Sequence, residues 1–425
     1  MKVAVLGLWH LGCVTAACCA KHFDVVGLDF DAANLAALKL GKAPLFEPGL
    51  DDLIKAGMAA GRLRFTGDIK EACADADILW VAYDTPVNEA DEADVESVLR
   101  EVRRSVPALP RGALVLLSSQ LPAGTCRLLE GEFGAQGYRF ACSPENLRLG
   151  KAIDIFTKAD RIIAGYRDER SKAQLAELFA PFTSQIVWMR PESAEMTKHA
   201  INSFLALSIT FMNEIARLCE VTGADAKEVE RGLKSESRIG PKAYLSPGGP
   251  FAGGTLARDI VTCTQLGRQF GEALEVIPAI KRSNDQHRLW TLQKLQRLFA
   301  GEPGRRIALL GLTYKPGTNT LRRSAAVELA QALHGAGYEV QAFDPSQPAL
   351  PPELGFIRLF PDVMEAVRSA DAVVVCTEWP EFLQLDWKTL VSLLRRPLIL
   401  DAARFLEKSP AGLPKVQYIT VGSPL

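Results

Sequence analysis

The segment Lys2-Val-Ala-Val-Leu-Gly-Leu-Trp-His-Leu-Gly12 decides the fold of this 425-residue chain. Its first five residues form an apolar strand pattern, two glycines border the turn, and an Ala-, Cys- and Val-rich helical pattern follows. A second strand pattern over residues 24–28 ends on Asp29, which follows Gly7 by 22 residues. Strand, glycine turn, helix, strand and acid, in this order, form the dinucleotide-binding fingerprint of a Rossmann-like sheet.

Gly7, Gly12 and Asp29 are therefore predicted cofactor-binding residues. A helix N-terminus attracts a pyrophosphate, and an acid at the end of the second strand bonds the ribose hydroxyls. No Arg directly follows Asp29, which favours NAD over NADP. The middle position of the fingerprint holds Trp9 instead of glycine, which places a large side chain where the pyrophosphate normally approaches the backbone.

The C-terminal third of the chain repeats this pattern. Residues 306–312 resemble residues 3–8, and residues 362–380 match residues 68–86 without a gap. Alternating strands and helices from about residue 300 predict a second doubly wound sheet. Between the two repeats, one long helical pattern over residues 195–221 is apolar on most sides. We therefore predict an α/β fold in which two Rossmann-like doubly wound parallel sheets are joined by a long central helix.

Length and composition bound the class of protein. A chain of 425 residues is too long for one core, and its net charge of −1 gives no reason to expect nucleic acid or an anionic membrane as partner. No apolar run reaches the roughly 18 residues of a membrane span, and the N-terminus has no signal-peptide pattern. The nine cysteines have no metal-ligand spacing. We expect a cytoplasmic protein with reduced thiols and no metal.

Polar residues follow three further strand patterns in the N-terminal part. Thr85, Gln120 and Glu145 lie at or just after strands that end near residues 83, 119 and 142. Ligands collect at the carboxyl ends of parallel strands, so these residues are candidates on topology alone. In the long helix, Lys198 and Asn202 are four residues apart and share one face. Buried polar groups there need partners or a cavity, although a contact with solvent near the helix start is an alternative.

A glycine-rich loop lies between the two repeats. It reads Ser246-Pro-Gly-Gly-Pro-Phe-Ala-Gly-Gly-Thr-Leu-Ala-Arg-Asp259, and an apolar-periodic segment begins directly after it. Glycines allow a backbone to approach a ligand closely, so the loop suits a chain wrapped around a bound molecule. The alternative is a flexible surface connection.

The chain resembles the UDP-glucose/GDP-mannose dehydrogenase family over nearly its whole length. The resemblance rests on many short motifs in the family's order and spacing: residues 7–12, Leu45-Phe-Glu-Pro-Gly-Leu50, Thr85-Pro86, Ser143-Pro-Glu-Asn-Leu-Arg148, Lys198 with Asn202, Arg238-Ile-Gly240, residues 251–259, Gly311-Leu-Thr-Tyr-Lys-Pro-Gly317, Arg322 and Thr377-Glu-Trp379. The Phe-Glu-Pro-Gly-Leu motif resembles the UDP-glucose branch more than the N-acetyl-hexosaminuronate branches.

The resemblance implies a two-step, four-electron oxidation of a UDP-hexose with two molecules of NAD. It implies catalytic roles for Lys198, Asn202, Asp259, Glu145 and the residue at position 255. It also implies three domains: an N-terminal NAD-binding domain (1–192), a central helical linker and dimerisation domain (193–298) and a C-terminal UDP-sugar-binding domain (299–425). The further binding residues that it implies are Thr85, Gln120 and Arg322 for the cofactor, and Arg238, Tyr244, Phe251, Gly253, Lys315 and Arg404 for the substrate.

One departure from the family pattern bears directly on the reaction. The family places a nucleophilic Cys in this loop, whereas this chain has Thr255, and Arg258 replaces the Lys beside Asp259. A thiol with a reference pKa of about 8.5 supplies thiolate near neutrality, but an alcohol does not without a dedicated base. We therefore expect an NAD-dependent dehydrogenase with an atypical or two-electron reaction. The alternative is a catalytically impaired homologue that binds sugar nucleotides in a regulatory or assembly role. Arg238 resembles a residue that reaches a neighbouring subunit, which implies a homodimer or higher homo-oligomer.

Overall fold

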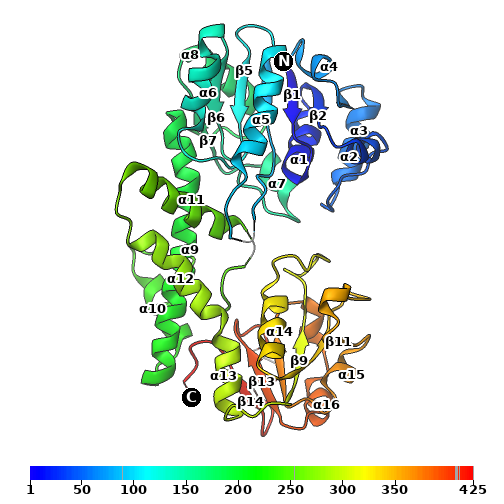
Figure 1. Ribbon diagram of the computed structural model, residues 1–425, viewed down its shortest axis with the longest axis vertical. Helices are drawn as coiled ribbons and strands as arrows, with labels where there is room; N and C mark the ends of the chain where they lie inside the picture. The colour runs from blue at the N-terminus through cyan, green and yellow to red at the C-terminus, as the bar shows by residue number, and fades with distance from the viewer. Residues whose placement is uncertain (89, 253, 407–409, 411, 425) are drawn as a thin grey trace. The chain divides into compact units, whose positions relative to one another are not determined.

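The computed structural model describes residues 1–424 except 89, 253, 407–409 and 411. Two compact units make up the chain, Met1–Ile201 and Asn202–Leu425, and each contains one sheet. The boundary between them lies inside α9 (Pro191–Thr222), the long green helix of Figure 1. The predicted central helix is confirmed and begins four residues earlier than its pattern indicated. The division into three domains stays a prediction.

The sheet of the N-terminal unit has eight strands in the order β3-β2-β1-β4-β5-β6-β7-β8. Its first six strands are parallel, and β7 pairs with β6 in the antiparallel sense. The strands are β1 (Lys2–Leu6), β2 (Asp24–Leu28), β3 (Leu63–Thr66), β4 (Ile78–Val81), β5 (Leu114–Leu117), β6 (Arg139–Cys142), β7 (Ile162–Gly165) and β8 (Ile186–Met189). The helices are α1 (His10–Cys19), α2 (Ala32–Lys39), α3 (Leu50–Ala59), α4 (Ile69–Cys73), α5 (Val95–Ser105), α6 (Thr125–Phe133), α7 (Ala152–Thr157) and α8 (Glu169–Phe179).

In the described residues of the C-terminal unit, four helices lie between α9 and a six-stranded parallel sheet, whose order is β11-β10-β9-β12-β13-β14. Its helices are α10 (Ala226–Ser235), α11 (Thr255–Phe270), α12 (Val276–Arg288), α13 (Trp290–Leu298), α14 (Ala325–Gly335), α15 (Val363–Val367) and α16 (Trp387–Ser392). Its strands are β9 (Arg306–Leu310), β10 (Glu339–Phe343), β11 (Ile357–Leu359), β12 (Ala372–Val375), β13 (Leu398–Asp401) and β14 (Gln417–Ile419). Two parallel α/β sheets and a long helix confirm the predicted fold class.

Helices cover both faces of the N-terminal sheet. Along β1, Val3 and Val5 belong to one buried cluster, while Ala4 and Leu6 belong to another. Side chains alternate between the faces of a strand, so a sheet that is buried on both faces reads as a continuous apolar run. This is why the segment from residue 2 to residue 6 contains no polar residue after Lys2.

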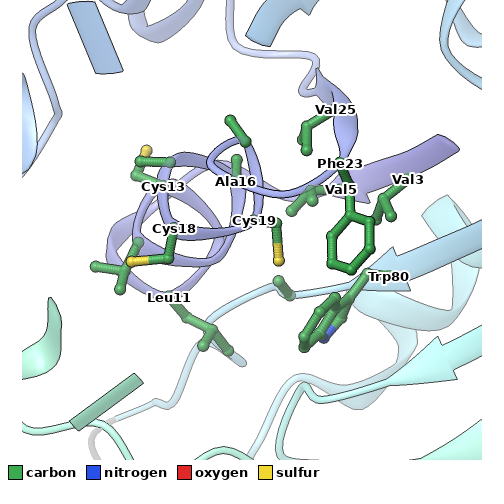
Figure 2. Close-up of a cluster of buried hydrophobic side chains, with 14 of the residues drawn as sticks. Val3, Val5, Leu11, Cys13, Ala16, Cys18, Cys19, Phe23, Val25 and Trp80 are labelled. Atoms are coloured by element: carbon green, nitrogen blue, oxygen red, sulfur yellow. The ribbon is translucent and has the colours of Figure 1, made fainter. Parts of the chain in front are cut away.

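The cysteines of α1 are packing residues. Figure 2 shows Cys13, Cys18 and Cys19 among the apolar side chains around α1, together with Val5 and Trp80. All three thiols are buried, and burial raises the pKa of Cys18 to about 12. A thiol in such surroundings stays protonated and behaves as a small hydrophobic group.

The described residues contain neither a helix that could span a membrane nor a cluster that could bind a metal ion. None of their helices is long and apolar enough to cross a membrane. Within the same residues, no group of three or more His, Cys, Asp or Glu side chains could hold a metal ion.

Candidate functional site

The turn between β1 and α1 has the tight geometry that the fingerprint predicts for a cofactor site. Gly7 has a φ of +91°, and a Cβ atom there would lie 2.7 Å from the ring of Tyr83. A Cβ atom on Gly12 would lie 1.7 Å from the carbonyl oxygen of Gly7. Only glycine fits these two positions. The ring of Tyr83 lies against Gly7, and α1 packs at Gly12 directly against the backbone of the turn.

Asp29 fixes this turn from the end of β2. Its Oδ2 accepts a hydrogen bond of 2.6 Å from the N–H of Leu8, and its Oδ1 accepts one of 3.0 Å from the N–H of Asp31. The first turn of α1 has no side-chain cap, and Trp9 at the N-cap position leaves 48% of its surface exposed. The uncapped N–H groups and the tight glycine turn fit a dinucleotide pyrophosphate.

The predicted residues Thr85 and Gln120 are brought together. The hydroxyl of Thr85, after β4, donates a 2.9 Å hydrogen bond to the carbonyl oxygen of Gln120, after β5. Both residues are buried. Because β4 and β5 are neighbours in the sheet, their carboxyl ends meet at one edge, as the topology predicted.

Glu145 and Lys198 form an ion pair in the N-terminal unit. The Nζ of Lys198 lies 3.5 Å from Oε1 of Glu145, and Lys198 is only 8% exposed. The other oxygen of Glu145 accepts a 2.7 Å hydrogen bond from the N–H of Leu147, which holds the carboxylate at the start of its loop. Gln120, Glu145 and Lys198 border a hollow of about 10 Å³, room for roughly one water molecule. A larger cavity of about 370 Å³ is also lined by Glu145 and Lys198.

Asn202 and Asp259 form the second polar pair, in the C-terminal unit. The side-chain amide of Asn202 donates to Oδ2 of Asp259, and the carboxyl group is completely buried. A carboxylate that is removed from water requires such donors. Asp259 lies one helical turn after Thr255, which is the first residue of α11 and is exposed. The hydroxyl of Thr255 therefore stands at a helix N-terminus, where a thiolate would be stabilised.

Cys263 is unsuited to replace the missing thiol. Its Sγ lies 3.9 Å from the hydroxyl of Ser203, within a partly buried part of α11. Burial raises the pKa of Cys263, and the charge of Asp259 adds to this effect. A thiol with a raised pKa supplies little thiolate at neutral pH.

The glycine-rich loop is held in place through its own backbone. Asn213 of α9 accepts a 3.0 Å bond from the N–H of Gly248 and donates to the carbonyl oxygen of Gly249. Asn284 of α12 accepts a 2.9 Å bond from the N–H of Phe251 and donates to that residue's carbonyl oxygen at 3.0 Å. Residues 248–251 of the loop are thus held by side chains of α9 and α12.

His287 adds a third attachment to this loop. Its Nε2 lies 2.8 Å from the carbonyl oxygen of Gly248, and its Nδ1 lies 3.1 Å from Nη1 of Arg217. A carbonyl only accepts and a guanidinium only donates, so the ring is neutral with its proton on Nε2. Burial lowers the pKa of His287 to about 4, which agrees with a neutral ring. Asn213, Asn284 and His287 were missed in the sequence, where buried polar residues in helical patterns were the available signal.

The remaining predicted residues have varied surroundings. Arg404 has a φ of +58°, and its Nη1 lies 3.0 Å from the carboxylate of Asp225, the N-cap residue of α10. Phe251 packs in an apolar cluster with Ala206 and Ile280. Four other predicted residues, Arg238, Tyr244, Lys315 and Arg322, are exposed or partly exposed, and Gly253 lies outside the described residues. The substrate-binding roles of these residues stay predictions.

Comparisons with known proteins agree with the fold. Three segments match sequence models of the UDP-glucose/GDP-mannose dehydrogenase family: residues 1–183 its NAD-binding domain, 192–286 its central domain and 308–408 its UDP-binding domain.

Individual proteins match over their whole length. The UDP-glucose 6-dehydrogenase of Rhizobium meliloti is 34% identical, with all of both chains covered. The UDP-glucose 6-dehydrogenase TuaD of Bacillus subtilis is 32% identical over all of this chain and 93% of that protein. Among solved structures, a UDP-glucose dehydrogenase from Pyrobaculum islandicum has a TM-score of 0.88 at 30% identity, with 99% of this chain and 98% of that chain covered.

Proposed function

The chain belongs to the UDP-glucose/GDP-mannose dehydrogenase family, and from this premise we propose that it oxidises a UDP-hexose with NAD. The observation that carries the proposal is two polar contacts, Lys198 with Glu145 and Asn202 with Asp259. Lys198 and Glu145 also line the cavity of about 370 Å³, and a cavity with a few convergent polar groups is the first candidate for a ligand site. Relatives named UDP-glucose 6-dehydrogenase make UDP-glucose the first substrate to test.

The first oxidation removes a hydride from the alcohol carbon and a proton from its hydroxyl. Bound NAD supplies the hydride acceptor. The resemblance to the family assigns the hydroxyl proton to Lys198 and Asp259, and Asn202 donates to the carboxylate of Asp259. The alcohol becomes an aldehyde by loss of one hydride, which the bound dinucleotide would accept, and one proton, so two electrons are transferred.

A second oxidation meets an obstacle at Thr255. A thiol would add to the aldehyde and give a thiohemiacetal, but a threonine hydroxyl is a weak nucleophile without a dedicated base. The reaction therefore stops after two electrons, or it continues through the aldehyde hydrate with Glu145 or Asp259 as base. Both routes remain open for this chain.

Counting NADH per UDP-glucose tests the proposal. One NADH per sugar supports a two-electron reaction, and two NADH per sugar support oxidation through the hydrate. The variant Thr255→Cys should raise the count from one to two if the missing thiol is what stops the reaction. No NADH at any enzyme concentration would reject the dehydrogenase.

The second candidate function is a homologue that binds sugar nucleotides without turnover. Thr255 in place of the nucleophile, together with Trp9 in the cofactor turn, favours it. Calorimetry separates the two functions, because a pure binding protein should bind UDP-glucose but not NAD. Binding of both UDP-glucose and NAD would favour the dehydrogenase over the binding protein.

We also propose that the protein forms a homodimer through α9. Phe204, Phe211 and Leu218 follow one another at intervals of seven residues, and 67%, 44% and 58% of their surfaces are exposed. Residues at this spacing share one face of a helix, and a large exposed apolar face usually marks an interface. Arg238, whose side chain is 87% exposed, is the residue that would reach a neighbouring sugar nucleotide. Light scattering should report a dimer for the wild type and a monomer for Phe211→Asp.

A further inference from the structure

Glu47 is a buried carboxylate to which the proposed reaction assigns no role. It lies in the Leu45–Leu50 motif before α3, and only 4% of its surface is exposed. Its Oε2 accepts a 2.7 Å hydrogen bond from the N–H of Gly150, and its Oε1 accepts one of 2.9 Å from the N–H of Ala152. These donors belong to the loop that begins with Glu145 and to the first residue of α7.

A third donor reaches Glu47 from the cofactor turn. Nε2 of His10 lies 2.9 Å from Oε2 of Glu47, and a carboxylate only accepts, so the ring nitrogen donates. His10 is the first residue of α1 and directly follows Trp9. One carboxylate thus receives hydrogen bonds from the helix start that would face the pyrophosphate and from the loop that carries Glu145.

The carboxylate of Glu47 is suited to hold several hydrogen-bond donors at once. Hydrogen bonds to a charged carboxylate are shorter and stronger than those between neutral groups. A glutamine could not accept both backbone N–H bonds, because one of its two terminal atoms is itself a donor. The two backbone donors and His10 are therefore held by the charge of Glu47, and a shift of one donor changes the position of the others.

We propose that Glu47 is a positioning residue that transmits occupancy of the cofactor turn to the loop carrying Glu145; this rests on NAD binding at that turn, as in the proposed function. A pyrophosphate on the first N–H groups of α1 fixes His10, His10 fixes the carboxylate of Glu47, and Glu47 fixes Gly150 and Ala152. Glu145, which pairs with Lys198, is then set in the same loop. The consequence is that cofactor binding restrains Glu145, which is already paired with Lys198, before the sugar reacts.

Hydrogen exchange of residues 144–152 tests this coupling without the need for turnover. NAD should slow the exchange of these amides by about tenfold in the wild type, within the usual range of coupling factors. In His10→Ala the effect of NAD on this segment should disappear, and His10→Gln, which keeps a donor, should restore it. If His10 had only a structural role, His10→Ala would speed the exchange of the residue 144–152 amides equally with and without NAD.

Asp51→Ala is the matched control. It removes the 2.9 Å hydrogen bond that Asp51 accepts from the N–H of Ala43, in the same segment of chain as Glu47. This bond involves neither His10 nor the backbone of residues 150–152. The effect of NAD should persist in this variant. The coupling between the cofactor turn and residues 144–152 would be overturned by either of two results. One is that NAD does not slow exchange in the wild type, and the other is that NAD slows it equally in His10→Ala. Calorimetry that detects no NAD binding by the wild type would instead overturn the proposed function, and the coupling with it.

Discussion

The turns that follow the first strand of each sheet are built alike up to one point. Gly7 after β1 has a φ of +91°, and Gly311 after β9 has a φ of +88°. The next residue in each turn donates a 2.6 Å hydrogen bond to an aspartate at the end of the neighbouring strand, Leu8 to Asp29 and Leu312 to Asp344. The same order of six strands surrounds both turns. The repeat in the sequence is thus a repeat of hydrogen bonds as well as of strands.

The two turns differ in how the first helix begins. Residues 7–9 separate β1 from α1, which starts without a side-chain cap, whereas residues 311–324 separate β9 from α14. Ser324 caps α14 by accepting from the N–H of Ala326, and its hydroxyl donates to the carbonyl oxygen of Leu312. The N-terminal turn therefore leaves N–H groups of its helix for a pyrophosphate. In the C-terminal turn, Ser324 bonds to the N–H of Ala326, and the long loop before it holds Lys315 and Arg322.

The largest expected effect comes from Gly12→Ala. The added Cβ would meet the carbonyl oxygen of Gly7 at 1.7 Å, so α1 must move away from the turn. We expect a loss of about 3 kcal/mol in stability, as for a severe overpacking change, and a fall of NAD affinity by about a hundredfold or more. Thermal unfolding and calorimetry measure the two effects. The control is Gly335→Ala in α14, where the new Cβ meets nothing within 4 Å. Equal losses of stability and NAD affinity in both variants would show that the close contact between position 12 and Gly7 is not their cause.

Exchanging each aspartate for asparagine should separate ligand binding from stability. Asp29→Asn should weaken NAD binding by about tenfold, the value of one charge-assisted hydrogen bond to a ribose. Asp344→Asn should instead cost about 2 kcal/mol in stability at pH 7, because Asp344 is buried and also accepts from Thr313, Ser346 and Trp379.

The cost of Asp344→Asn should depend on pH. Burial opposes ionisation of Asp344, but the hydrogen bonds from Leu312, Ser346 and Thr313 outweigh it and lower the pKa of the carboxyl. A carboxyl with a lowered pKa in the folded state stabilises the protein above its unfolded pKa of about 3.9 and loses this contribution as the pH falls through its folded pKa. Urea unfolding at pH 7 and at progressively lower pH should show the two proteins converging. A difference that grows toward acid pH would reject the ionised carboxylate.

Ser324→Ala should have a moderate effect that is confined to the C-terminal sheet. The variant removes the side-chain cap of α14 and should cost about 1 kcal/mol in stability. NAD affinity should not change, because Ser324 bonds to Leu312 and Ala326 and the variant leaves the predicted cofactor residue Arg322 in place. Weaker NAD binding in this variant would show that the cap of α14 also positions Arg322 for the cofactor.

The smallest effect is expected for Trp9→Gly, which restores the usual fingerprint. Trp9 is 48% exposed and makes no side-chain cap for α1, so its removal should change NAD affinity by less than about threefold, as for other surface substitutions. Calorimetry decides the point. An increase of tenfold or more would mean that the indole obstructs the pyrophosphate, and the N-terminal turn would then be the less open of the two.

Short-range patterns gave much of the fold and part of the site. The apolar runs at residues 2–6 and 306–310 and the glycines after them predicted two sheets, because a strand buried on both faces and a turn with positive φ each require particular residue types. Glu145 with Lys198 and Thr85 with Gln120 were predicted one by one, and the structure brings the members of each pair together.

The antiparallel pairing of β7 was not predicted. The residues of β6 and β7 meet through the single pair Cys142 and Gly165. A short apolar strand carries no mark of its direction in the sequence, since both directions bury the same side chains.

The sequence by itself determined the residue types that the local backbone demands: glycine at positions 7 and 12, the acid at position 29 and threonine in place of a nucleophile at position 255. Only the tertiary structure decided which polar groups meet across long distances in the chain. Glu47 meets Gly150 and Ala152, and Asn284 meets Phe251, because packed helices and strands bring them together. A buried hydrogen bond needs a partner in space, and no local pattern records which one it will be.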